Sequence, residues 1–139
     1  MGLASIIITV AILNFDRLTS SKPTVAQSAY FQTQLNQVEY IEIRTHPKSG
    51  GDVLATLRTP SQVTDIKTGI KLDRIHAPTG SFGRIDLIFY RADGSEFRIN
   101  YSPEKDRIKF ENPWGIEGLA FGDLATIIDR VCNQSVSME

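Results

Sequence analysis

The chain has 139 residues, of which 41% are hydrophobic and 22% are charged, and its formal net charge at pH 7 is -1. This size and composition predict one compact domain with a single modest core. A net charge near zero argues against a nucleic-acid-binding protein, which needs a clustered positive surface to displace phosphate counterions. The single cysteine, Cys132, excludes an internal disulfide. We interpret it as a small buried residue near a helix end, with a reactive thiol as the alternative.

An apolar run without charged side chains occupies residues 2–15 and ends at Asp16. It is shorter than the roughly 20 residues of a membrane-spanning helix but matches the core of a secretory signal. Small residues at Thr24 and Ala26 predict cleavage after Ala26. We therefore expect residues 1–26 to be a signal peptide, or a membrane anchor if uncleaved, and the protein to be extracytoplasmic. A buried N-terminal segment of an intracellular domain is the remaining alternative.

The polar segment 27–37 is typical of a tether, and we expect a single domain over residues 38–133 and a frayed tail over residues 134–139. Residues 38–44 alternate apolar and polar side chains, which predicts a half-buried strand. A glycine-containing turn separates them from a second alternating run, residues 53–57, so the two runs predict an antiparallel hairpin.

A helix start follows the hairpin. Thr59 can cap the first amides, Pro60 suits the first helical position and Gln62 can complete a capping box. Apolar side chains then recur at helical spacing until Gly69, which predicts a short helix over residues 60–68.

Two apolar-rich runs flank a turn in residues 84–102. A two-residue turn would place apolar side chains opposite polar ones. A three-residue turn, Ala92 to Gly94 with Gly94 in the left-handed region, instead creates one clean apolar face. The expected cross-strand pairs are Phe89 with Phe97, Leu87 with Ile99, and Ile85 with Tyr101.

The remaining pattern predicts a strand over residues 107–111 and, after a loop, a helix over residues 119–131 with an apolar stripe on one face. The sum is an α+β fold: an antiparallel sheet of about five strands with two helices packed on one face, preceded by the N-terminal apolar segment.

Motifs for catalysis or cofactor binding are absent from the sequence, and we expect no catalytic residue, no metal and no cofactor. His46 and His76 have no second ligand at metal-binding spacing. Asp73, His76 and Ser81 could form a nucleophile and base on paper, but no nucleophile-elbow motif supports this, and we interpret them as surface-loop residues. The glycine-rich run 80–83 lacks the ending of a phosphate-binding loop.

Two candidate binding features remain. Trp114 lies in a loop before the last helix, where a large aromatic residue either plugs the end of the core or projects as a binding anchor; we favour the plug. Tyr90, Arg91 and Arg98 are expected on the outer face of the sheet, where a mixture of Arg and Tyr suits a protein partner.

The order of elements over residues 38–131 resembles small uncharacterised extracytoplasmic bacterial domains that follow a signal or lipoprotein leader. No leader cysteine for lipidation is present. The resemblance implies architecture and compartment. We therefore expect an exported or membrane-tethered, non-enzymatic binding domain with a protein partner, whose identity and oligomeric state stay open. The alternatives are a small hydrolase using the loop around Asp73, His76 and Ser81, and an intracellular structural or regulatory domain.

Overall fold

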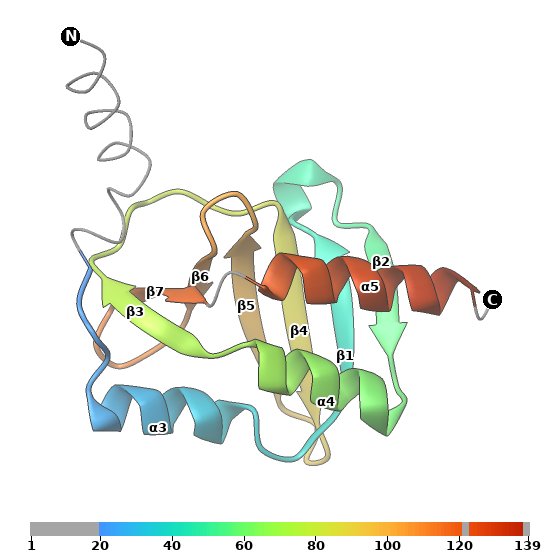
Figure 1. The fold of residues 1–139 in the computed structure, drawn as a ribbon, viewed down its shortest axis with the longest axis horizontal. Helices are drawn as coiled ribbons and strands as arrows, with labels where there is room; N and C mark the ends of the chain where they lie inside the picture. Colours follow the sequence, from blue (N-terminus) through green and yellow to red (C-terminus); the bar gives the residue numbers. More distant parts are fainter. Residues whose placement is uncertain (1–19, 121–122, 138–139) are drawn as a thin grey trace, which may run out of the picture.

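The structure is a computed structural model that describes residues 20–120 and 123–137 (Figure 1). The described chain has α+β architecture, with a seven-stranded antiparallel sheet and three α-helices. The expected class and the antiparallel sheet are confirmed, with two more strands and one more helix than the sequence predicts. The apolar run 2–15, and with it the expected signal peptide or anchor, lies outside the described residues.

Five consecutive strands lie between the second and third α-helices, and one short 3-10 helix, η1, joins the first two strands. In chain order the elements are α3 (Val25–Gln34), β1 (Val38–Thr45), η1 (Pro47–Ser49), β2 (Val53–Leu57), α4 (Pro60–Gly69), β3 (Leu72–His76), β4 (Ile85–Arg91), β5 (Glu96–Ser102), β6 (Arg107–Phe110), β7 (Glu117–Ala120) and α5 (Leu124–Ser137). The strand order across the sheet is β2-β1-β4-β5-β6-β7-β3, so β2 and β3 form the two edges.

The central hairpin, β4 and β5, has the register that the three-residue turn predicts. Gly94 has a positive φ of 87°, which a glycine adopts without steric cost. The observed pairs include Phe89 with Phe97, Leu87 with Ile99, and Ile85 with Tyr101. The register is fixed because a slip of one residue would turn the whole apolar set away from the core.

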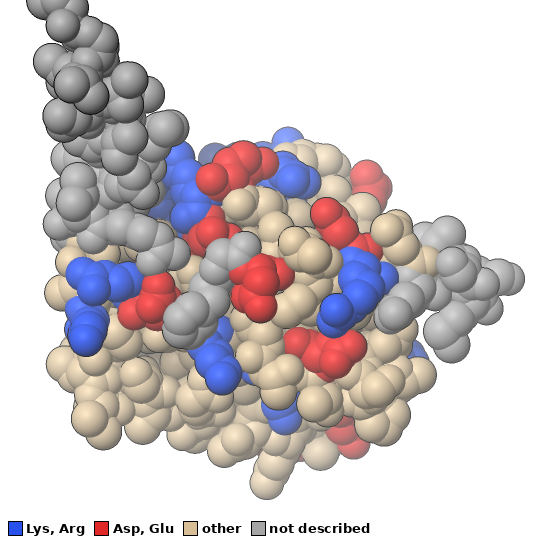
Figure 2. All heavy atoms as spheres, in the orientation of Figure 1, with Lys and Arg blue, Asp and Glu red and all other residues tan. Residues whose placement is uncertain are grey.

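All three helices lie on one face of the sheet, with α4 and α5 side by side over β1 and β2 (Figure 1). The buried core lies between this face and the helices. Phe31 of α3 is fully buried and packs edge-on against Phe97 and Phe110. On the helix-bearing side of the molecule, Lys and Arg side chains alternate with Asp and Glu, and no large patch of one sign forms (Figure 2).

The segment 27–37, expected to be a tether, instead contributes a helix to the domain. Thr24 accepts a hydrogen bond from the Gln27 amide at 3.1 Å, and the Gln27 side chain accepts one from the Thr24 amide at 2.8 Å. This capping box begins α3, and Phe31 and Leu35 fix the segment to the core. The domain therefore begins before residue 27.

Two further strands were not expected. β3 and β7 pair with each other at the far edge of the sheet, and β7 joins them to β6. Ahead of α3, Ser21 forms an isolated antiparallel bridge with Ile75 of β3. The last helix begins at Leu124 rather than at residue 119, because residues 117–120 form β7, and it continues to Ser137 into the segment expected to be a tail.

Candidate binding groove on the open sheet face

The face of the sheet opposite the helices carries no helix among the described residues, and its side chains are polar and aromatic. Successive residues of a strand point to opposite faces, so the register aligns the outer residues in rows. One row across β4, β5 and β6 consists of Asp86, Asn100 and Lys109. The next row across β4 and β5 consists of Ile88 and Arg98. This surface is called the open face below.

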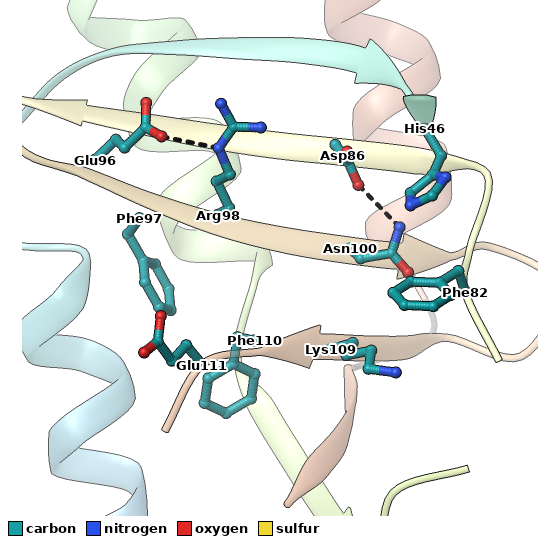
Figure 3. Close-up of a pocket in the computed structure, with 10 residues that line it drawn as sticks. All are labelled: His46, Phe82, Asp86, Glu96, Phe97, Arg98, Asn100, Lys109, Phe110 and Glu111. Atoms are coloured by element: carbon teal, nitrogen blue, oxygen red, sulfur yellow. Dashed lines mark hydrogen bonds and ion pairs between the residues drawn. The ribbon is translucent and has the colours of Figure 1, made fainter. Parts of the chain in front are cut away.

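A groove of about 520 Å³ runs over β5 and β6 on the open face. Its two ends differ chemically: His46 and Phe82 lie together at one end, and Glu96 lies at the other (Figure 3). The lining side chains come from β4, β5, β6 and three segments next to strands, and they are His46, Phe82, Asp86, Glu96, Phe97, Arg98, Asn100, Lys109, Phe110 and Glu111.

The first end of the groove is aromatic and basic. Phe82 belongs to the loop between β3 and β4 and is 53% exposed. The Lys109 ammonium lies 4.1 Å and the Lys48 ammonium 5.2 Å from the centre of the Phe82 ring. The His46 ring lies 5.2 Å from the same ring. Two cations next to one exposed ring form a surface suited to an anionic or carboxylate-bearing group. These four residues are called the Phe82 cluster below.

The loop that carries Phe82 is held against β5 through Gly83, the residue that follows Phe82. The Asn100 side chain accepts from the Gly83 amide at 2.6 Å and donates to the Gly83 carbonyl at 2.9 Å. A Cβ atom on Gly83 would lie 2.1 Å from the Tyr101 carbonyl oxygen, so only glycine allows this approach. Asn100 also donates to Asp86 at 2.9 Å, which orients the floor of the groove.

The second end of the groove is acidic. Glu96 pairs with Arg98 at 2.9 Å, and this hydrogen bond raises the pKa of Arg98. Glu111 is exposed and forms no ion pair with the part of the chain that the structure describes. At the first end, the Lys109 ammonium also lies 3.5 Å from the buried Glu117 carboxylate. One end of the groove therefore carries aromatic and lysine side chains, with Asp86 and Glu117 nearby, and the other end carries the carboxylates of Glu96 and Glu111.

Two of the three residues expected on the open face lie there. Tyr90 stacks on Tyr40 with 4.5 Å between ring centres, and burial, followed by the charge of Glu42, raises the Tyr90 pKa. Arg98 lines the groove.

The expected position of Arg91 is wrong. Its guanidinium points to the helix side and donates to the backbone and side-chain oxygens of Gln34 at 2.8 and 2.7 Å. Arg91 therefore satisfies a carbonyl at the end of α3.

Trp114, expected to plug the core, is 42% exposed and lies outside the groove. Its ring packs perpendicular to Tyr30 of α3, with 5.5 Å between ring centres. The Asn112 side chain orders the loop by accepting from the amides of Trp114 and Ile116, each at 3.1 Å. Phe31 of α3 is the aromatic residue of this region that is fully buried in the core.

The hydrogen bonds that His76 and Ser81 make do not join these two residues as nucleophile and base. The His76 Nδ1 atom lies 2.8 Å from the Ala77 carbonyl oxygen, and the Ser81 amide donates to Thr79 at 3.4 Å. Within residues 20–120 and 123–137, no cluster of His, Cys, Asp and Glu side chains could hold a metal ion.

Cys132 is half-buried, and burial raises the pKa of its thiol.

Sequence reasoning missed the main groove residues. The glycine-rich run 80–83, which contains Phe82, is considered above only as a phosphate-binding loop, and Asn100 is one of several polar strand residues. A usable signal was Gly83 directly after a large aromatic residue, because a glycine beside a strand start marks a close backbone approach.

Among the described residues, no helix combines the length and the apolar character needed to cross a membrane. No protein-family model, curated protein or solved structure matches the chain.

Proposed function

We propose that this chain is an exported or membrane-tethered domain that binds a protein partner in the groove of the open face, without catalysis. One observation carries the proposal: the groove has an aromatic, basic end and an acidic end, on a sheet face that the described helices leave uncovered. The hydrogen bonds of Asn100 and the close approach at Gly83 hold it in shape without a ligand. A preformed site lowers the entropic cost of binding.

The chemistry of the groove favours an extended segment of the partner with separated opposite charges. A carboxylate of this segment would meet the Phe82 cluster, and a basic side chain would meet Glu96 and Glu111. The groove is bordered by strands that supply regularly spaced side chains, which suits an extended peptide. Such complementarity sets orientation and specificity more than affinity.

Export is supported by the apolar run 2–15, and the position of α3 changes where processing is expected. A cut after Ala26 would remove the Thr24 cap, the Ser21 bridge to Ile75, and the hydrogen bond from Arg74 to the Ser20 carbonyl oxygen at 2.6 Å. We therefore expect the mature chain to retain Ser20, through an uncleaved anchor or an earlier cut. Cell fractionation with mass spectrometry of the mature N-terminus tests this, and a cytoplasmic chain would contradict export.

The binding proposal is tested with a phage-displayed library of random peptides selected on the purified full chain. We expect the selected peptides to combine an acidic and a basic residue, and to shift the NMR amide signals of Phe82, Arg98 and Lys109. Lys48→Glu should weaken binding about tenfold, which corresponds to the loss of about 1.4 kcal/mol. The matched control is Lys71→Glu, an exposed lysine just before β3. Equal effects of the two substitutions, or shifts confined to other surfaces, would overturn the groove as the binding site.

A further inference from the structure

The loop between β3 and β4 is attached to the open face at two residues. Gly83, at the end of the loop, is bound to Asn100 of β5, as described above. Thr79, near its start, is bound to Glu117 of β7: the Thr79 amide donates to the Glu117 Oε1 atom at 3.1 Å, and the Thr79 hydroxyl donates to Oε2 at 3.2 Å. Phe82 lies between these two attachment points in the chain, so they determine where its ring stands.

Glu117 is a buried carboxylate that is only 1% exposed. Burying a carboxylate is costly unless hydrogen bonds and a cation compensate for the lost water. Thr79 supplies two hydrogen bonds, and the Lys109 ammonium supplies the cation at 3.5 Å. The ladders of β7 to β3 and β6 use backbone groups and need no acidic side chain at this position. The carboxylate therefore serves the loop and the groove rather than the sheet.

Lys109 connects the buried carboxylate to the groove. Its ammonium contacts Glu117 and also lies 4.1 Å from the centre of the exposed Phe82 ring, and the two side chains lie next to each other at one end of the groove (Figure 3). Asp86 supplies a second carboxylate at this end. Lys48, the other lysine of the Phe82 cluster, forms no ion pair with the described residues. Glu117 thus places a fixed negative charge beside the lysines that would meet an anion.

We propose that Glu117 makes the Phe82 cluster specific for a group with one negative charge, such as a carboxylate. This inference rests on the proposed binding function of the groove. Glu117 positions the loop through Thr79 and partly neutralises Lys109. A single carboxylate is attracted by Lys48 and Lys109, whereas the second charge of a phosphate adds further repulsion from Glu117, because the Coulomb energy is proportional to the charge of the ligand. The cluster therefore suits an acidic side chain or a C-terminal carboxylate of the partner rather than a phosphorylated side chain.

Two small probes that share an aromatic ring, phenylacetate and phenyl phosphate, test the specificity on the purified full chain. At about pH 8 the first carries one negative charge and the second carries two. NMR titration of the amide signals of Phe82 and Lys109 gives a Kd for each probe. For Glu117→Gln we expect phenylacetate to bind about threefold and phenyl phosphate about tenfold more tightly than to the unchanged chain, because the removed repulsion acts on one charge in the first probe and on two in the second.

Two further variants separate charge from loop position. Glu117→Ala removes both acceptors of Thr79, so the Thr79 amide should exchange its hydrogen faster and the Phe82 signal should move without any ligand. Glu117→Gln keeps an oxygen for the Thr79 amide and should largely retain that protection. Glu39→Gln removes the same charge from an exposed residue outside the groove and should leave both Kd values unchanged. Far-UV circular dichroism verifies that each variant is folded.

The failure of this inference differs from the failure of the proposed function. If both probes shift the groove signals but Glu117→Gln changes their Kd values by the same factor, or not at all, the specificity is wrong and the groove remains a binding site. If neither probe shifts the groove signals in any variant, the proposed binding site is wrong and the specificity fails with it. Unchanged exchange of the Thr79 amide in Glu117→Ala would contradict the positioning of the loop.

Discussion

The two faces of the central sheet use the same strands but bury their side chains by different means. Leu87 and Ile88 are neighbours in β4, and their side chains are 0% and 1% exposed. Leu87 faces the helices and belongs to the continuous apolar core. Ile88 faces the open side, where its cross-strand neighbours are Glu42 and Arg98. Equal burial therefore has two origins: rigid apolar packing on one face, and a cover of long polar side chains on the other.

The largest loss of stability is expected from removing the aromatic ring that closes the helix-covered face. Phe31→Ala should lower the free energy of unfolding by about 3–5 kcal/mol, because it deletes a fully buried ring and leaves a cavity beside Phe97 and Phe110. Urea unfolding measures the loss. Val25→Ala, at an exposed position of the same helix, is the control and should change stability little. A small effect of Phe31→Ala would mean that α3 is not part of the cooperative domain.

The direct comparison of the two faces is Leu87→Ala against Ile88→Ala. We expect about 3 kcal/mol for Leu87→Ala and about half of that for Ile88→Ala, because Arg98 on the open face is more than half exposed and can move into the vacated space. Urea unfolding of both variants under identical conditions gives the difference. Equal losses would show that the open face is packed as rigidly as the core.

The shape of the open face depends on Gly83. Gly83→Ala should destabilise the domain by about 2 kcal/mol, because its Cβ would overlap the backbone of Tyr101 and force the Phe82 loop away from β5. Ser81→Ala in the same loop is the control, since Ser81 is exposed. Urea unfolding reports the stability, and the NMR amide signal of Phe82 reports the movement of the loop. An unchanged Phe82 signal would contradict the role given to Gly83.

The smallest effect is expected at the tip of the β4–β5 hairpin, where neither face is involved. Hydrogen bonds from the Ser95 side chain and amide lower the Asp93 pKa. A lowered folded-state pKa contributes stability above the unfolded-state value, and the contribution is lost as the pH falls through the folded-state pKa. At neutral pH, the urea midpoint of Asp93→Ala should therefore lie slightly below that of the unchanged chain. The difference between the two midpoints should become smaller below about pH 3.9, the ordinary pKa of an aspartate. A difference in midpoint that widens with acid would contradict this assignment.

The sequence was most informative where the pattern was local. The register of the central hairpin followed from which turn length produces one apolar face, and the capped start of α4 followed from Thr59 and Pro60. α3 was missed because it buries few side chains and its composition is polar, so that only the three-residue spacing of Thr24 and Gln27 could have indicated its start. β7 was missed because four residues including a glycine are too short for a periodic signal.

The site was harder to predict because it depends on contacts between distant segments. Tyr90 and Arg98 were placed on the correct face by alternation within one hairpin. Phe82 and Lys109 meet only after the β3–β4 loop folds over β6, 27 residues further along the chain. Arg91 was misplaced because its basic side chain was taken as a surface residue, whereas its partner is the C-terminal end of α3.

The pairing of β3 with β7 determines when the sheet can be completed. Leu72 lies opposite Ala120, and no other strand forms a ladder with β3 in the described part of the chain. A polypeptide that emerges N-terminus first, from a ribosome or through a translocation pore, therefore leaves β3 hydrated until residues 117–120 have followed. Contacts between such distant segments slow folding. A product truncated before Glu117 would leave β3 without its ladder and would expose the outer edge of β6, which stays paired with β5 on its other side.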